Sequence, residues 1–236
     1  MFNRRQWITA LTVLPFVVLA SWAHAQDAGT IERVSGAATI TGADNATRPA
    51  VANERIRSGD TLSTDGRGEA LVKLADNSTV ALRANTQFRF NEVKFEDRST
   101  DSIVSTLLRG TARMVTGLIG KSRPNNVALT ARTATVGIRG TDFEVAIIEE
   151  GDSTARAGVY NVVNDGSTNV RLASGPSLDV ARDQTAFAPE RPAPGEAPLQ
   201  LLDTRPAFFR GGGFDTLMQQ LTDQPMRAIQ QMPMFR

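Results

Sequence analysis

The stretch Ala134–Ile148 constrains the fold of this chain more than any other. It reads A-T-V-G-I-R-G-T-D-F-E-V-A-I-I, and its larger apolar residues alternate with other residues on both sides of Gly140. A period of two is typical of half-buried β-strands, in which successive side chains point to opposite faces of a sheet. A glycine inside such a pattern commonly marks a bulge. We therefore expect two strand segments joined by a bend at Gly140.

The same alternation recurs in shorter runs over residues 29–188. The runs lie at 69–74, 79–83, 88–90, 127–131, 159–163, 170–172 and 178–180, with turn-forming pairs at Asp65-Gly66, Asp76-Asn77, Gly151-Asp152 and Asp165-Gly166. The sequence therefore predicts an all-β fold, an antiparallel β-sandwich or β-roll of short strands and hairpins. Ile103–Leu108 fits either a strand or one amphipathic helical turn, and Lys121–Asn126 is predicted to be a loop.

Several motifs in this region resemble the FecR domain family. Arg139, Gly140, Thr141, Asp142 and Phe143 form R-G-T-D-F, which is similar to that family's R-G-T-x-F segment. Upstream, G-D-T-L-S-T at 59–64 and D-N-S at 76–78 resemble its G-D-x-x-x-T motif and D-G-S turn. The motifs occur in the family's order, so the resemblance spans roughly residues 29–188. It implies an exported β domain, which we expect to occupy residues 26–188.

Residues 1–25 have the features of a signal peptide. Arg4 and Arg5 precede an apolar run at Ile8–Leu19, and Ala23-His24-Ala25 offers an A-x-A cleavage site. The run is shorter than the roughly 20 residues of a membrane-spanning helix. We expect cleavage after Ala25, a periplasmic or secreted mature protein, and no transmembrane span in it. FecR-like regulators also carry a cytoplasmic anti-sigma segment, which we do not expect here.

Composition after cleavage excludes several kinds of chemistry. The only His and both Trp fall within residues 1–25, and the chain has no Cys. Ser-His-Asp triads, thiol nucleophiles and the usual zinc sites are therefore excluded. Removing Arg4 and Arg5 leaves 24 Lys and Arg against 25 Asp and Glu, which gives no support for binding nucleic acid. Flat aromatic platforms for sugars are also scarce, because Tyr160 is the only remaining Tyr or Trp.

Carboxylates remain as the candidates for catalysis. Asp142 with Glu144, or Glu149 with Glu150 and Asp152, are the acidic groups considered, and their places at strand edges or turns favour solvated charges. Asp165, Ser167 and Asn169 alternate like the start of a calcium loop, but the twelfth position is Pro176 where an EF-hand needs Glu. We expect no catalytic residues, no metal and no cofactor.

The segment between Asp101 and Asp142 is basic. It contains Arg109, Arg113, Lys121, Arg123, Arg132 and Arg139 and no acidic residue. Arg109, Arg113, Lys121 and Arg123 are therefore candidates for contact with an anion or a partner. Pairing with acids elsewhere in the chain is the alternative.

Beyond Ala188 the composition changes twice. Residues 189–206 are rich in Pro and predict an extended linker, and residues 207–236 form a Met-rich, partly helical tail. Leu217, Met218, Leu221 and Met226 give this tail an apolar side that either folds back over the β domain or binds a partner.

These features together predict a non-catalytic binding or sensing module. Its expected partner is another protein of the cell envelope or an anionic envelope component. A structural subunit of a surface assembly and a carboxylate-dependent envelope hydrolase are the alternatives.

Overall fold

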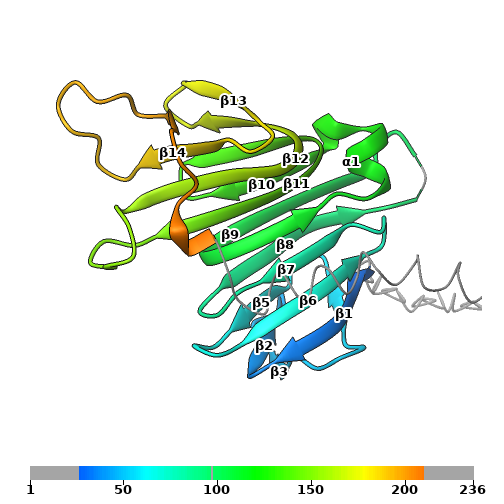
Figure 1. Ribbon diagram of the computed structural model, residues 1–236. Helices are drawn as coiled ribbons and strands as arrows, with labels where there is room; N and C mark the ends of the chain where they lie inside the picture. Colours follow the sequence, from blue (N-terminus) through cyan, green and yellow to red (C-terminus); the bar gives the residue numbers. More distant parts are fainter. Residues whose placement is uncertain (1–26, 97, 210–236) are drawn as a thin grey trace, which may run out of the picture.

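The computed structural model describes residues 27–96 and 98–209 (Figure 1). Within them the strands are β1 (Asp27–Ser35), β2 (Ala38–Thr41), β3 (Thr47–Pro49), β4 (Arg55–Arg57), β5 (Thr61–Thr64), β6 (Glu69–Leu74), β7 (Thr79–Leu82), β8 (Gln87–Lys94), β9 (Ser102–Val115), β10 (Val127–Ala131), β11 (Ala134–Ile148), β12 (Gly158–Leu172), β13 (Ser177–Ala181), β14 (Thr185–Pro189) and β15 (Gln200–Leu202). The helical elements are α1 (Leu118–Ser122) and the 3-10 turns η1 (Pro124–Asn126) and η2 (Ala207–Phe209). The all-β prediction is confirmed.

These strands belong to one hydrogen-bonded sheet. Its main order is β15-β14-β12-β11-β10-β9-β7-β6-β1-β4, with β13 beside β12 and a branch of β3, β2, β5 and β8 that joins β9. All the pairs between described strands are antiparallel except β9–β10, which is parallel. The expected antiparallel arrangement is wrong at this pair, because the connection through α1 and η1 returns the chain in the same direction.

Three strands are longer than predicted. β9 has 14 residues, and β11 and β12 have 15 each. Gly110, Gly140 and Gly166 lie within them at positive φ, so each strand continues through an irregular position instead of ending there. β11 consequently pairs with β10 in its first half and with β9 in its second. The predicted turn at Asp165-Gly166 is therefore wrong: it is an irregularity inside β12.

Two ambiguous stretches are resolved by the sheet. Ile103–Leu108 lies in β9, where Ile103 and Leu107 are fully buried and alternate with more exposed residues. Lys121–Asn126, predicted as a loop, instead contains the end of α1 and the turn η1.

Apolar side chains fill both sides of part of the sheet. The main core includes Phe88, Phe90 and Phe143, which are all 0 % exposed, and the rings of Phe88 and Phe90 meet edge to face at 5.0 Å. Burying one such ring stabilises the fold by about 2–3 kcal/mol. A smaller cluster contains Tyr160 stacked on Phe187 at 4.4 Å, with Phe209 buried beside them. The start of the predicted tail therefore folds back onto the sheet.

The proline-rich segment also returns to the sheet, since β15 pairs with β14 beyond the predicted boundary at Ala188. Glu196 fastens the intervening loop. Arg156 donates to both of its carboxylate oxygens, at 2.5 and 2.7 Å, and the Ala193 amide and the Gln200 side chain donate at 2.7 and 3.0 Å. The division into domain, linker and tail stays a prediction.

This loop should loosen in acid. The side-chain hydrogen bonds from Arg156 and then the Ala193 amide lower the pKa of Glu196 from 4.5 to about 2. A lowered folded-state pKa means that the carboxylate stabilises the loop above about pH 4.5, and that this is lost as the pH falls through about 2. We expect hydrogen-exchange protection factors of residues 191–199 to fall across this window. Glu196→Gln should show the loosened loop already at pH 7, and equal protection in both proteins would contradict this.

The predicted signal peptide and the tail residues Leu217, Met218, Leu221 and Met226 lie outside the described residues. Among residues 27–96 and 98–209, no helix has both the length and the apolar character needed to cross a membrane.

Candidate functional site

The R-G-T-D-F segment forms the bend in β11. Gly140 has a φ of 62°, and the pairing with β12 shifts between Arg139 and Asp142. Ile138 and Phe143 both face the core, although strict alternation would place residues five positions apart on opposite sides of the sheet. The register shift at the bend supplies the extra residue that returns β11 to the core-facing phase. The predicted bend at Gly140 is confirmed.

Thr141 and Phe143 hold the bend in place. The Thr141 amide donates to the Thr116 hydroxyl at 2.8 Å, and the Thr116 amide donates to the Thr141 carbonyl at 3.0 Å. Thr116 directly follows β9, so this exchange joins the end of β9 to the bend. Four of the five motif residues thus shape the β domain, whereas Arg139 is exposed.

Substituting Gly140 tests this role. Gly140→Val should lower the free energy of unfolding by about 2 kcal/mol, because β-branched residues strongly disfavour positive φ. Gly137→Val, in the same strand, is the matched control: Gly137 has no positive φ, and an added Cβ would meet only the Asn169 carbonyl at 3.7 Å. Urea unfolding of both variants checks the expectation, and similar losses would contradict it.

The upstream motifs are structural as well. Gly59 has a φ of 93° and donates its amide to the Phe90 carbonyl at 2.6 Å. Asp60 is 3 % exposed and accepts from the Arg48 side chain at 2.7 Å and the Arg57 amide at 3.1 Å. These contacts fix the turn between β4 and β5 against β3 and β8.

The D-N-S turn connects two distant parts of the chain. Asp76 is 0 % exposed and accepts hydrogen bonds from the Ser78 amide and hydroxyl, both at 2.9 Å, and from the Ile119 amide at 3.1 Å. Ser78 in turn accepts from the Gly117 amide at 2.8 Å. The turn between β6 and β7 therefore satisfies the amides at the start of α1, which α1 itself cannot satisfy.

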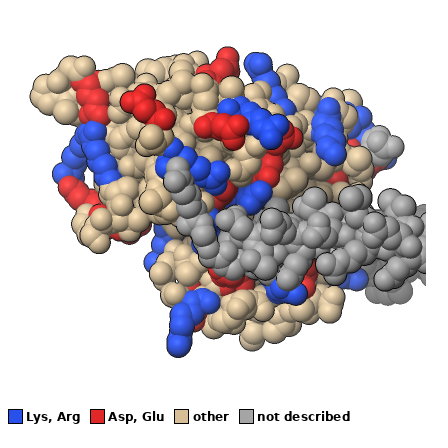
Figure 2. All heavy atoms as spheres, viewed as in Figure 1, with Lys and Arg blue, Asp and Glu red and all other residues tan. Residues whose placement is uncertain are grey.

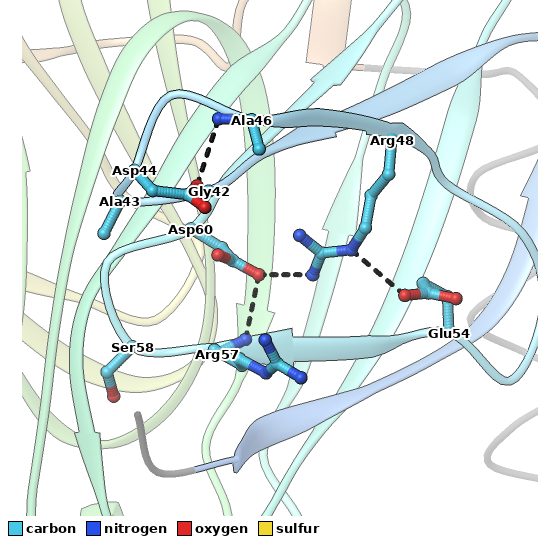
Figure 3. Close-up of a pocket in the computed structure, with 9 residues that line it drawn as sticks. All are labelled: Gly42, Ala43, Asp44, Ala46, Arg48, Glu54, Arg57, Ser58 and Asp60. Atoms are coloured by element: carbon cyan, nitrogen blue, oxygen red, sulfur yellow. Dashed lines mark hydrogen bonds and ion pairs between the residues drawn. The ribbon is translucent and has the colours of Figure 1, made fainter. Parts of the chain in front are cut away.

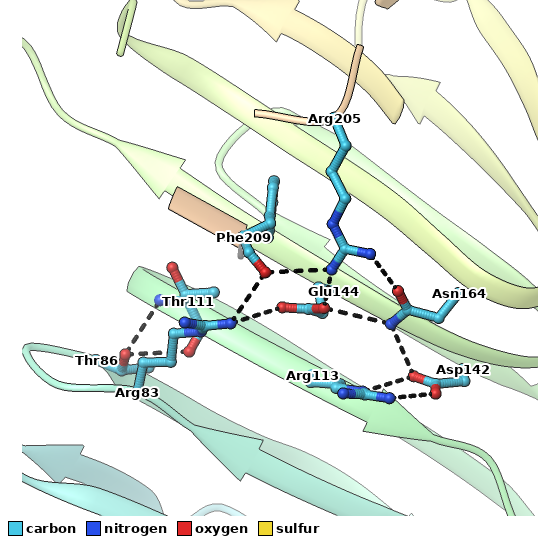
Figure 4. A network of polar contacts seen from close by, with 9 residues as sticks. All are labelled: Arg83, Thr86, Thr111, Arg113, Asp142, Glu144, Asn164, Arg205 and Phe209. Atoms are coloured by element: carbon cyan, nitrogen blue, oxygen red, sulfur yellow. Dashed lines mark hydrogen bonds and ion pairs between the residues drawn. The ribbon is translucent and has the colours of Figure 1, made fainter. Parts of the chain in front are cut away.

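A polar network surrounds Glu144 on β11 (Figure 4). Its carboxylate is 0 % exposed and accepts from Arg205 at 2.6 Å, Arg83 at 3.2 Å and Asn164 at 3.3 Å. Both arginines also approach the Phe209 carbonyl, at 3.3 and 3.5 Å. The network thus ties residues 205–209 to β7, β11 and β12.

The family model described as FecR protein matches residues 60–175, which include these motifs except for Gly59. Residues 60–175 form a FecR domain. The Glu144 network attaches the segment 205–209 to this domain.

Comparison with solved structures gives partial matches. A crystal structure of a candidate anti-sigma factor from Parabacteroides distasonis is 16% identical with a TM-score of 0.48, over 62% of this chain and 61% of that one, and a second crystal structure of the same description gives the same values. This chain thus spans less than two thirds of that protein's length. A cell surface anchoring domain is 21% identical with a TM-score of 0.26, over 26% of this chain and 82% of that one. No curated protein matches the chain.

Asp142 and Glu144, the first carboxylates considered for catalysis, are already bound by other side chains. Arg113 donates to both oxygens of Asp142, at 2.8 and 2.6 Å. Asn164 donates to Asp142 as well as Glu144. The expectation of a solvated charge is wrong for Glu144, because the sequence gives no sign of the distant arginines that allow its burial.

The three carboxylates of the second acidic group, Glu149, Glu150 and Asp152, each have a different partner. Glu149 approaches Arg132 at 3.8 Å and Glu150 approaches Arg191 at 2.9 Å. Asp152 accepts from Thr154, whose hydrogen bonds lower the pKa of Asp152. Among the described residues, no group of three potential ligands is arranged to hold a metal ion.

The predicted basic contact residues separate into two kinds. Arg113 is paired with Asp142, and Arg123 lies 3.7 Å from Asp101. The side chains of Arg109 and Lys121 are exposed and make no hydrogen bond or ion pair with another described residue. On the face shown in Figure 2, basic and acidic side chains are intermixed, so no basic strip of single sign appears there.

The sheet branch contains a hollow of about 560 Å³ between the β2–β3 and β4–β5 connections (Figure 3). Arg48 lies between two of its acids, 2.7 Å from Asp60 and 3.0 Å from Glu54. These ion pairs neutralise much of the lining and hold the β2–β3 hairpin against the following turn. We assign the hollow a structural role.

Proposed function

We propose that the chain is exported and acts in the cell envelope as a non-catalytic FecR-like module that binds another envelope protein. The proposal rests on the family match together with the use of its motif residues as fold-forming contacts. The A-x-A site at residues 23–25 supports export. The ion pairs that occupy Asp142 and Glu144 favour binding over carboxylate catalysis, because a general acid or base needs access to substrate.

The partner contact is proposed to include α1. Leu118 is 50 % exposed, and Lys121 on the same short helix is exposed without a partner among the described residues. Both side chains are accessible to a protein partner. The Met-rich segment of residues 210–236 is a second candidate contact.

Affinity capture with matched variants tests this function. The tagged protein is expressed in bacteria with an envelope, cross-linked in the cells and purified from the envelope fraction. We expect a defined partner to be captured, and Leu118→Ser with Lys121→Glu to reduce its yield at least about fivefold, in line with loss of an interface anchor. Leu201→Ser, which changes another exposed apolar residue, is the control.

Truncation after Phe209 keeps the buried Phe209 and tests whether residues 210–236 contribute to capture of the partner. Recovery in the cytoplasmic fraction would refute export. Capture of only further copies of this chain would favour the alternative of a structural subunit. Equal capture by both substituted proteins would remove α1 from the proposed interface.

A further inference from the structure

A row of hydroxyl and arginine side chains crosses the sheet. Strand register places nine residues next to one another on successive strands: Thr47 on β3, Thr41 on β2, Thr61 on β5, Arg89 on β8, Thr106 on β9, Thr130 on β10, Thr135 on β11, Arg171 on β12 and Ser177 on β13. We call this set the hydroxyl row. The central strands that carry it run side by side in Figure 1.

The hydroxyl row lies on the side of the sheet opposite the main core. All nine residues are half-buried or exposed, whereas their neighbours along the strands, such as Leu62, Phe88 and Leu129, are buried in the core. The Thr106 hydroxyl donates to Asn91 at 2.8 Å. The other eight side chains make no hydrogen bond or ion pair with a described residue. Their hydroxyl and guanidinium groups are available to a ligand.

The surroundings of the row are basic. Lys94, Arg109 and Arg139 are on the same side of β8, β9 and β11, and none of their side chains has a hydrogen bond or ion pair with a described residue. Glu92 and Asp179 lie near the row and keep their negative charges, because their hydrogen bonds come from the neutral side chains of Ser102 and, at 2.7 Å, Asn169. The five cations Arg89, Lys94, Arg109, Arg139 and Arg171 outnumber these two acids. Within the described residues, this side of the sheet therefore favours an anion.

The spacing of the charges favours a polymer over a small ion. Arg89 and Arg171 are four strands apart, or roughly 19 Å at about 4.8 Å per strand. A single small anion cannot contact both arginines. A linear polymer with repeated carboxylates can contact both. Once one carboxylate is bound, the next is held near the other arginine at a high effective concentration, which raises the overall affinity.

We propose that the hydroxyl row binds a linear acidic polysaccharide. Its carboxylates would pair with Arg89 and Arg171, and its hydroxyl groups would exchange hydrogen bonds with the threonines between them. Such binding uses charge and hydroxyl groups, so it does not need the aromatic platform that the chain lacks. Gly137 and Ala128 lie in the neighbouring register row, where short side chains let a flat polymer approach the sheet.

This inference goes beyond the proposed protein contact. α1 and the hydroxyl row share no residue, so each can fail without the other.

Binding of polygalacturonate to the purified chain 26–236 tests the proposal. We expect saturable binding that weakens with salt and that monogalacturonate does not reproduce. Arg89→Ala with Arg171→Ala should weaken it about tenfold, consistent with the loss of two exposed charge contacts. Arg57→Ala with Arg67→Ala removes two exposed cations away from the row and should change the affinity less than about twofold.

A second pair of variants distinguishes recognition from general attraction of polyanions. Thr130→Val with Thr135→Val keeps charge and strand preference but removes two hydroxyl groups, and should weaken polygalacturonate at least about threefold while leaving polyglutamate unchanged. Circular dichroism establishes that each variant is folded. Equal binding of polyglutamate and polygalacturonate, equal effects of the two arginine pairs, or no effect of the threonine pair would each overturn the proposal.

Discussion

Glu144→Gln should lower the free energy of unfolding by about 3 kcal/mol, one of the two largest losses that we expect from the substitutions considered. The Glu144 side chain is fully buried, so a neutral amide in its place leaves the guanidinium groups of Arg83 and Arg205 without their negative partner. Breaking a buried ion pair costs about 3–5 kcal/mol. The lower end applies because the Arg83 and Arg205 side chains are 17% and 29% exposed and so are partly screened by water. Urea unfolding at pH 7, followed by far-ultraviolet circular dichroism, measures the loss.

Asp142→Asn is the matched control for this prediction. Asp142 lies two residues away on the same side of β11, and Arg113 donates to both of its oxygens, but both partners keep 16–20% of their side-chain surface exposed. We expect a smaller loss, about 1 kcal/mol. Glu144→Gln should in addition speed amide exchange at Phe209, because Arg83 and Arg205 would no longer be held beneath its carbonyl. Equal losses for the two variants, with unchanged exchange at Phe209, would show that burial of Glu144 contributes little.

Sequence reasoning found the parts of the fold that depend on neighbouring residues. Alternation predicted the strands, and one glycine within an alternating run predicted the bend in β11. The family motifs marked the turns now seen at Asp60 and Asp76. In each case the sequence pattern lies within a few residues of the strand, bend or turn that it predicts.

Contacts between distant residues were not accessible in this way. Arg83 and Arg205 each lie 61 residues from Glu144, so no local period connects them. The pairing of Arg113 with Asp142, 29 residues away, was also missed, although both residues had been singled out separately. The hydroxyl row shows the same limit. Its members are scattered over residues 41–177, and strand register alone brings them together.

The second large effect is expected at Asp76, where Asp76→Ala should lower the free energy of unfolding by about 3 kcal/mol. The substitution leaves the Ser78 amide, the Ser78 hydroxyl and the Ile119 amide without their acceptor in a site that excludes water. Each unsatisfied buried donor costs about 1–3 kcal/mol, and partial relaxation of the turn reduces the total. Because Ile119 lies in the first turn of α1, we also expect faster amide exchange at residues 117–123 than in the unchanged protein.

Asp65→Ala separates this effect from the loss of an ordinary turn. Asp65 makes the same local contact, accepting the amide two residues later at 3.0 Å, but it is exposed and its partner Arg67 can bond to water instead. We therefore expect a change within about 0.5 kcal/mol for Asp65→Ala. If both alanine variants unfold at the same urea concentration, the link from the D-N-S turn to α1 does not stabilise the domain. If only Asp76→Ala unfolds early and loosens α1, the D-N-S turn serves to join β6 and β7 to the crossover that makes β9 and β10 parallel.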